Sequence, residues 1–221
     1  MMWCSRLYGG VTGMGKALAL VFAVASPVSA EQIGVVAFGD SLTQGYGLIE
    51  QNGFVPQMRK WLAENGVDVR LVNAGVSGDT TAGGLARIDW TLTEDVDAMI
   101  LTLGGNDMLR GLDPAVSRAN LASILDAART RDVEVLLVGM TAAGNYGPDY
   151  KQAFDGMYPA LAAEYGTLFH ENFFAAFDSS DPAAVAGLMQ PDGIHPNAEG
   201  VALIVNDLGP DVLKLLERVA E

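Results

Sequence analysis

The stretch VVAFGDSLTQGYG (residues 35–47) joins an apolar run to a loop that contains glycine, aspartate and serine. A continuous apolar run, here residues 33–38, is typical of a strand buried on both faces of a parallel sheet. A simple turn would suffice to end such a strand, yet this one ends on Gly39, Asp40 and Ser41. Ser41 is therefore either a turn residue or a nucleophile, and the rest of the sequence must separate the two interpretations.

Strand-like and helix-like segments alternate through the rest of the chain. Further apolar runs predict strands at residues 69–74, 97–103, 133–140 and 167–170. Periodic segments predict helices at residues 55–65, 81–92, 114–131, 150–166 and from about 197 to 219. Pro159 is expected to kink or split the fourth of these helices. The alternation predicts an α/β fold with one central parallel sheet of about five strands and helices on both faces.

Length and composition indicate one globular domain. The chain has 221 residues, half of them apolar, which is enough to bury a full core. No internal repeat, low-complexity tract or linker interrupts the mature chain, so we expect a single domain over residues 31–221. The formal net charge of −14 repels phosphate backbones and argues against a nucleic-acid partner.

The first thirty residues have the pattern of a secretory signal peptide. Two basic side chains precede the apolar run ALALVFAVA (residues 17–25) and the small-residue segment SPVSA (residues 26–30). The run is about half of the ~20 residues that cross a bilayer as a helix. We predict cleavage between Ala30 and Glu31, a periplasmic or secreted enzyme, and no stable membrane anchor, the alternative being an uncleaved anchor. The only cysteine, Cys4, lies in this leader, so the mature domain would have no disulfide.

Glycine-rich polar segments follow three of the predicted strands. GDS (residues 39–41) follows the first strand, NAGVSGD (residues 73–79) the second, and GGND (residues 104–107) the third. In open α/β sheets, ligands bind outside the carboxyl ends of the strands. We therefore expect these three segments to lie side by side along one edge of the sheet.

A serine attacks an acyl carbon only when an oriented base removes its proton. The chain has two histidines. Asp192 precedes His195 by three residues, and Gly193 permits a tight turn in which the carboxylate binds Nδ1 and leaves Nε2 free. An ordinary turn before a helix is the alternative for this segment. His170 has no acid on its own short loop and is interpreted as a structural or surface residue.

Ser77 is the rival nucleophile. Its segment GVSGD departs from the nucleophile-elbow pattern G-x-S-x-G only at the last position. We prefer Ser41, which directly follows the strand expected to be the most central. Gly78 would then offer its backbone N–H, Asn106 its side-chain amide and Ser41 its own N–H to an oxyanion. The neighbouring aspartates are interpreted as loop braces or helix caps: Asp40, Asp79 and Asp107.

Together these segments resemble the four sequence blocks of the GDSL, or SGNH, hydrolases. The resemblance assigns Ser41 as nucleophile and oxyanion donor, Gly78 and Asn106 as further donors, and Asp192 and His195 as acid and base. All blocks are present and in order. SGDTTAGGLAR, LGGNDMLRGLDP, and NYG followed by YKQAF are similar to the small bacterial exported arylesterases and acyl-CoA thioesterase/lysophospholipases. That branch implies a three-layer α/β/α flavodoxin-like fold, broad ester and thioester hydrolysis, and no metal or cofactor.

The segment MLRGLDP (residues 108–114) leaves the loop that carries Asn106 and is expected to contact the acyl group. Met108, Leu109 and Leu112 are apolar at positions where polar residues are usual, so we interpret them as a mobile lip, the alternative being a helix anchor. The expected substrate is a small-molecule ester or thioester. A carbohydrate deacetylase with the same four blocks and a non-catalytic binding module are the alternatives.

Overall fold

The structure is a computed structural model that describes residues 1–3, 9–10, 32–177 and 180–220. The predicted cleavage point between Ala30 and Glu31 and most of the predicted leader lie outside the described residues. Gln32–Glu221 forms one compact unit. The sheet, its covering helices and the predicted site residues all belong to the unit Gln32–Glu221.

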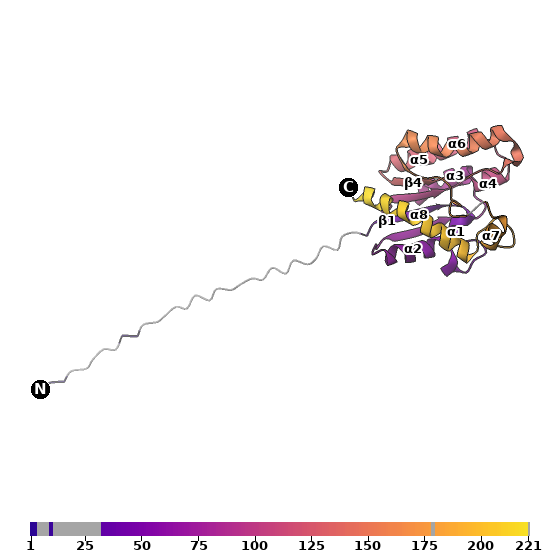
Figure 1. The fold of residues 1–221 in the computed structure, drawn as a ribbon. Coiled ribbons are helices and arrows are strands. Elements are labelled where there is room, and N and C mark those ends of the chain that lie inside the picture. Colours follow the sequence, from indigo (N-terminus) through magenta and orange to yellow (C-terminus); the bar gives the residue numbers. More distant parts are fainter. Residues whose placement is uncertain (4–8, 11–31, 178–179, 221) are drawn as a thin grey trace. The chain divides into compact units, whose positions relative to one another are not determined.

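Five parallel strands form one sheet in the order β2-β1-β3-β4-β5 (Figure 1). The α/β prediction with about five strands is confirmed. The middle strand is β3, however, so the expectation that β1 is the most central strand is wrong. The strands are β1 (Gly34–Gly39), β2 (Arg70–Gly75), β3 (Ala98–Thr102), β4 (Glu134–Val138) and β5 (Leu168–His170).

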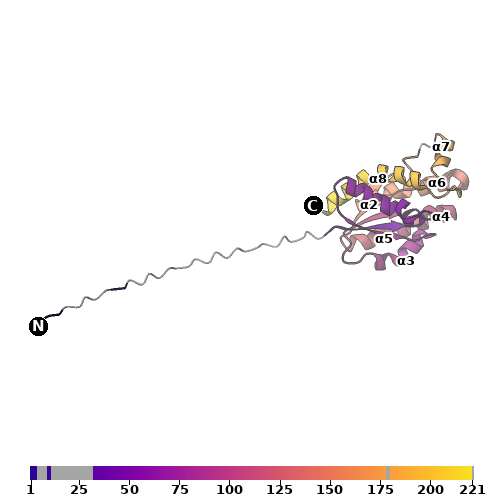
Figure 2. The same cartoon turned by 90° about the horizontal axis from the view of Figure 1, so that it is seen from below.

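Helices cover both faces of the sheet and make three layers. α2 (Phe54–Glu64) and α8 (Ala198–Val219) pack together on one face. α3 (Thr81–Thr91), α5 (Pro114–Arg129) and α6 (Pro148–Tyr165) pack on the other. Figure 2 shows α2 and α8 on one side of the sheet and α3 and α5 on the opposite side.

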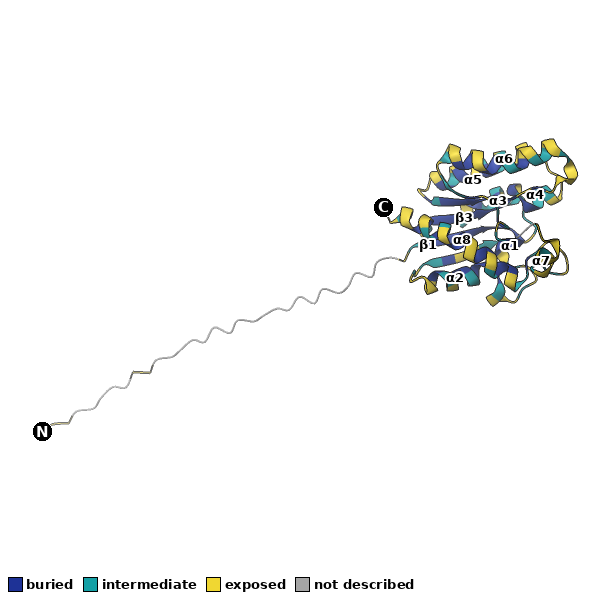
Figure 3. Ribbon diagram, in the orientation of Figure 1, coloured by how far each residue is buried: buried dark blue, intermediate teal, exposed yellow. Residues whose placement is uncertain are grey.

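The burial pattern follows from this layering. Every residue of β1 and β3 is buried, as the continuous apolar runs predicted, because helices cover both faces. The edge strand β2 is partly exposed, with Val72 at 37%. Buried residues concentrate in the sheet and on the inner helix faces (Figure 3).

The long helices α5 and α8 begin at residues whose side chains cap them. Asp113 accepts the backbone N–H of Ala115 at the start of α5, which then has Pro at its first position. Asn197 accepts the N–H groups of Glu199 and Gly200 at the start of α8. This cap fixes where the segment before α8, which contains His195, meets the helix.

α6 runs unbroken through Pro159, so the expected split does not occur. Tyr158 and Leu161 are buried on either side of the proline, and this packing keeps the helix together despite the missing N–H. Within the described residues, no helix combines the length and apolarity needed to cross a bilayer.

Three short helices were not predicted from the sequence. They are α1 (Ser41–Gln44), α4 (Gly105–Leu109) and α7 (Pro182–Gly187). α1 begins just after β1, and α4 begins three residues after the end of β3. They therefore carry Ser41 and Asn106 at the carboxyl edge of the sheet.

Candidate active site

A cavity of about 920 Å³ opens at the carboxyl edge of the sheet. The segments after β1, β2 and β3 all line it, together with the loop before α8. Ser41 is the first residue of α1 and is only 8% exposed. The side-by-side arrangement expected of the three glycine-rich segments is therefore found.

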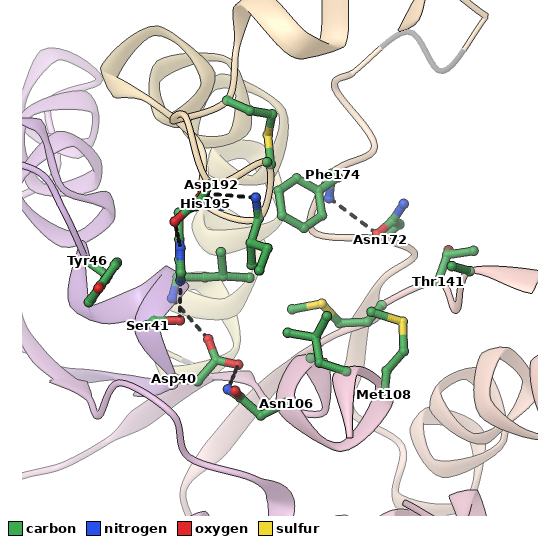
Figure 4. Close-up of a pocket in the computed structure, with 18 of the residues that line it drawn as sticks. Asp40, Ser41, Tyr46, Asn106, Met108, Thr141, Asn172, Phe174, Asp192 and His195 are labelled. Atoms are coloured by element: carbon green, nitrogen blue, oxygen red, sulfur yellow. Dashed lines mark hydrogen bonds and ion pairs between the residues drawn. The ribbon is translucent and has the colours of Figure 1, made fainter. Parts of the chain in front are cut away.

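A hydrogen-bonded relay joins Ser41, His195 and Asp192 (Figure 4). The Oγ atom of Ser41 lies 2.8 Å from Nε2 of His195, and Nδ1 of His195 lies 2.7 Å from Oδ2 of Asp192. The carboxylate therefore favours the proton on Nδ1, which leaves Nε2 as the acceptor facing the serine. This geometry is that of a serine nucleophile with an oriented general base.

The turn around Gly193 is built for this relay. Gly193 has a φ of +67°, a conformation that glycine adopts without strain. The second carboxylate oxygen of Asp192 accepts the backbone N–H groups of Ile194 and His195, both at 3.0 Å. The hydrogen bond from the His195 ring, followed by those two N–H groups, lowers the pKa of Asp192 to about 2. Asp192 therefore stays ionised at neutral pH.

Ser77 lies at the same cavity but in a different position. It is an exposed residue of the loop after β2. The Nε2 atom of His195 faces Ser41 Oγ at hydrogen-bond distance, and this geometry favours Ser41 over Ser77 as the group the base activates.

Gly78, Asn106 and Ser41 border the cavity together. Gly78 has a φ of +83°, and its carbonyl accepts a hydrogen bond from Nη2 of Arg110 at 2.8 Å. The Asn106 side chain is fixed by Asp40, because its Nδ2 atom lies 3.2 Å from Oδ2 of Asp40. An N–H of Nδ2 and the backbone N–H groups of Gly78 and Ser41 are the donors available to an oxyanion.

Asp40 is a buried carboxyl group beside the nucleophile, at 1% exposure. Burial raises its pKa to about 6, although the N–H of Leu42 and the Asn106 amide both bind its oxygens and act in the opposite direction. Asp40 caps α1 and orients Asn106. Because Asp192 is the carboxylate that binds Nδ1 of His195, these contacts agree with the interpretation of Asp40 as a loop brace.

The other two aspartates, Asp107 and Asp79, bind neighbouring side chains and backbone groups. The buried Asp107 accepts the N–H and hydroxyl of Thr81 at 2.8 and 2.6 Å and the hydroxyl of Ser117 at 2.9 Å. Asp79 forms an ion pair with Arg87 at 2.7 Å. Both fit the predicted role of loop brace.

Apolar side chains line most of the cavity away from Ser41. Met108 and Leu109 belong to this lining, whereas Leu112 does not line the cavity and is 37% exposed. Gly111 has a φ of +61° and packs against the Tyr146 ring, so a turn requires this glycine. Further apolar lining residues were missed because they come from segments distant from the motifs: Met140, Phe174, Phe177, Val185 and Met189. Ile194 also lines the cavity, although it lies within the motif between Asp192 and His195.

Tyr46 is a further residue of the site that the sequence did not reveal. Its ring lies against the His195 ring, with centroids 4.6 Å apart and planes tilted by 37°. The signal available in the sequence was its place between Gly45 and Gly47 in the nucleophile loop. A tyrosine at such a position does not by itself indicate contact with a histidine.

His170 does not line the cavity. It is buried at the end of β5, and its Nδ1 and Nε2 atoms lie 2.9 Å from Asp211 and 3.4 Å from Asp207 of α8. Its acidic partners thus come from another element, and it is structural rather than a surface residue. In the part of the chain that the structure describes, no three His, Cys, Asp or Glu side chains cluster so that they could hold a metal ion.

The sequence profile of the GDSL-like Lipase/Acylhydrolase family matches residues 37–203. The chain is similar to Esterase TesA of Pseudomonas aeruginosa, with 40% identity over 82% of this chain and 89% of that protein. It is also similar to an arylesterase of Vibrio mimicus, with 31% identity over the same shares of the two chains.

A third relative is the Thioesterase 1/protease 1/lysophospholipase L1 of Escherichia coli, at 33% identity over 78% of this chain and 79% of that protein. The fold agrees with these similarities. The crystal structure of TesA superimposes with a TM-score of 0.75, at 39% identity, over 82% of this chain and 99% of the TesA chain.

Proposed function

Because the chain belongs to the GDSL-like lipase/acylhydrolase family and is a serine ester hydrolase, we propose that Ser41 is its nucleophile, His195 its general base and Asp192 the carboxylate that orients the base. The observation that carries this proposal is the unbroken relay from Ser41 Oγ through His195 to Asp192. Ser41, Gly78 and Asn106 would form the oxyanion hole.

In the first half of the proposed reaction, Ser41 Oγ attacks the acyl carbon while His195 Nε2 takes the hydroxyl proton. The electron pair of the carbonyl moves to its oxygen, and the three donors stabilise that charge. The oxyanion then collapses, the bond to the leaving group breaks, and the imidazolium gives its proton to the departing alcohol or thiol. The product of this half is an acyl ester of Ser41.

In the second half, water attacks the acyl-serine and His195 again acts as the base. The carboxylic acid leaves as Ser41 regains its proton from the imidazolium. Asp192, whose pKa is lowered to about 2, remains negative throughout and stabilises the imidazolium in both halves.

We propose that the acyl group occupies the apolar part of the cavity. Phe174, Val185 and Met189 line this part together with Met108. Burial of each methylene contributes about 0.8 kcal/mol, so this lining favours an acyl chain longer than acetyl and argues against a carbohydrate deacetylase. Thioesters are proposed as additional substrates because one relative is named a thioesterase.

Export through a cleaved leader of residues 1–30 remains part of the proposal. It is supported by the basic, apolar and small-residue order of those residues. Loss of the leader would leave the mature domain at a net charge of −16, because two positive charges are removed from a chain whose total is −14. The mass of the protein recovered from the periplasm or medium tests this, with Glu31 expected as the first residue.

Hydrolysis of nitrophenyl acyl esters by the parent and by Ser41→Ala tests the proposed chemistry. We expect the parent to turn over the esters and the variant to retain at most the slow residual rate that an oxyanion hole alone supports. The same series with acyl thioesters measures the thioester preference. Full activity in Ser41→Ala would overturn the proposed mechanism.

A further inference from the structure

One amide side chain joins the nucleophile loop to the loop that carries the base. The Nε2 atom of Gln190 donates to the backbone carbonyl of Tyr46 at 2.8 Å and to that of Pro196 at 3.0 Å. The backbone N–H of Gln190 donates to the carbonyl of His195 at 2.8 Å. Gln190 thus donates hydrogen bonds to the carbonyl groups of both His195 and the next residue, Pro196.

Tyr46 continues this connection to the nucleophile. Its backbone N–H donates to the carbonyl of Ser41 at 3.1 Å, and its ring lies against the imidazole of His195. The contacts therefore form a closed circuit that runs from Ser41 through Tyr46 and Gln190 to His195. The hydrogen bond between His195 and Ser41 completes it. Figure 4 shows the Tyr46 ring beside Ser41 and His195.

Gly47, the residue after Tyr46, lies in close contact with the side-chain amide of Gln190. Gly47 has a φ of +74°, and a Cβ atom at this position would overlap the side-chain oxygen of Gln190. Only glycine gives both this conformation and this close approach without strain. The contact is therefore part of the local construction of the loop.

We infer that Gln190 is a positioning residue that sets the distance between Ser41 and His195. The inference rests on the proposed roles of these two residues. Ser41 is fixed by β1 and α1, whereas His195 lies on a loop, and a displacement of about 1 Å between reacting groups can cost a factor of 10² in rate. The two amide hydrogens of Gln190 hold that loop against the nucleophile loop.

The chain offers a matched control in Gln57. Its Nε2 atom also donates to two backbone carbonyls, those of Asn52 at 2.8 Å and Ala198 at 3.0 Å, and it also joins segments distant in sequence. Gln57 does not line the cavity. Methionine matches glutamine in length and flexibility but cannot donate, so Gln190→Met and Gln57→Met remove the same interactions at two places.

Both variants are compared with the parent for kcat and KM on a nitrophenyl ester, for the rate of labelling by a serine-directed phosphonate, and for Tm. For Gln190→Met we expect kcat and the labelling rate to fall about ten- to hundredfold, with KM within about twofold of the parent. For Gln57→Met we expect kcat to equal that of the parent. The decrease in Tm should be similar in the two variants, because each loses two hydrogen bonds to backbone carbonyls. Equal effects of the two variants on kcat and labelling would overturn the inference.

Gln190→Glu is measured at pH 8 alongside them, because it keeps the length and polarity of the side chain but has no amide hydrogens. We expect the kcat of Gln190→Glu to fall as far as that of Gln190→Met. Full activity in Gln190→Glu would also overturn the inference. Ser41→Ala distinguishes failure of the mechanism from failure of the positioning role. If Ser41→Ala is active, the proposed mechanism fails; if it is inactive and the Gln190 variants are not impaired, only the positioning role fails.

Discussion

The side-chain amide of Asn106 donates to Oδ2 of Asp40 across 3.2 Å, while Oδ1 of Asp40 accepts the backbone N–H of Leu42 at 3.0 Å. One buried carboxyl group thus connects the start of α1, which carries Ser41, with α4, which carries Asn106. A displaced Asn106 would leave the oxyanion with one donor fewer. Asp40 therefore supports Asn106 of the proposed oxyanion hole, even though it is not the acid of the relay.

Asp40→Asn is expected to lower kcat by up to about 10²-fold and to leave KM nearly unchanged. The asparagine side chain has only one acceptor oxygen, so it cannot accept hydrogen bonds from both Leu42 and Asn106. Its NH₂ group would face one of these two donors. Steady-state kinetics on a nitrophenyl ester measure both constants. If kcat in Asp40→Asn equals that of the parent, Asn106 does not depend on Asp40 for its orientation.

Asp40 also makes stability depend on pH. Its pKa is raised from 3.8 to about 6 in the folded protein, so the folded state binds a proton that the unfolded state has released between these values. Its stabilising contribution is therefore complete below about pH 4 and is lost as the pH rises through 6. Urea unfolding is measured for the parent and for Asp40→Asn over this pH range. As the pH rises from about 4 to above 6, the free energy of unfolding of the parent should fall relative to that of Asp40→Asn, by on the order of 3 kcal/mol. A difference that does not vary with pH would contradict the raised pKa.

Asp192→Asn is expected to lower kcat by on the order of 10³- to 10⁴-fold with the fold intact, because the amide cannot hold the reactive tautomer of His195. The pKa of Asp192, lowered to about 2, keeps it charged throughout the activity range. Protonation of Asp192 should therefore limit activity only as the pH falls towards about 2. Near-full activity in Asp192→Asn would exclude the residue from the site.

Substitutions at Leu109 and Leu112 test whether the acyl group binds in the cavity. Leu109 lines the cavity and Leu112 does not, so Leu112 is the control. In the parent, kcat/KM should rise about fourfold per methylene until the cavity is full, which corresponds to about 0.8 kcal/mol each. Leu109→Ser should flatten this preference and spare the two-carbon ester, whereas Leu112→Ser should leave the preference unchanged. An equal loss on every ester from about two to twelve carbons, with a lowered Tm, would mean that Leu109 only stabilises the fold.

The sequence was sufficient to predict the strands and the acid–base pair of the relay because both have local signals. Apolar runs such as β1 and β3 are continuous, and the turn from Asp192 to His195 keeps acid and base within three residues. Ser41 is 154 residues from His195, and it was assigned through its motif rather than through a local signal. Strand order has no local signal, which is why β1 was expected at the centre where β3 lies. The unbroken α6 likewise depends on packing around Pro159, which a propensity rule does not contain.

The cavity could be predicted only where it adjoins a motif. Met108 and Leu109 follow Asn106 closely and were identified for that reason. Phe174 and Met189 come from segments after β5 with ordinary apolar composition, and only the fold brings them to the cavity. Gln190 was missed on the same grounds, since its partner Tyr46 is 144 residues away.

The proposal that Ser41 is the nucleophile is tested most directly by finding which residue a serine-directed phosphonate modifies. The parent, Ser41→Ala and Ser77→Ala are treated with the phosphonate, digested and analysed by peptide mass spectrometry, with ester hydrolysis measured in parallel. We predict modification of Ser41 in the parent and in an active Ser77→Ala, and neither modification nor activity in Ser41→Ala. Modification of Ser77, or hydrolysis by Ser41→Ala at the rate of the parent, would contradict the assignment of Ser41.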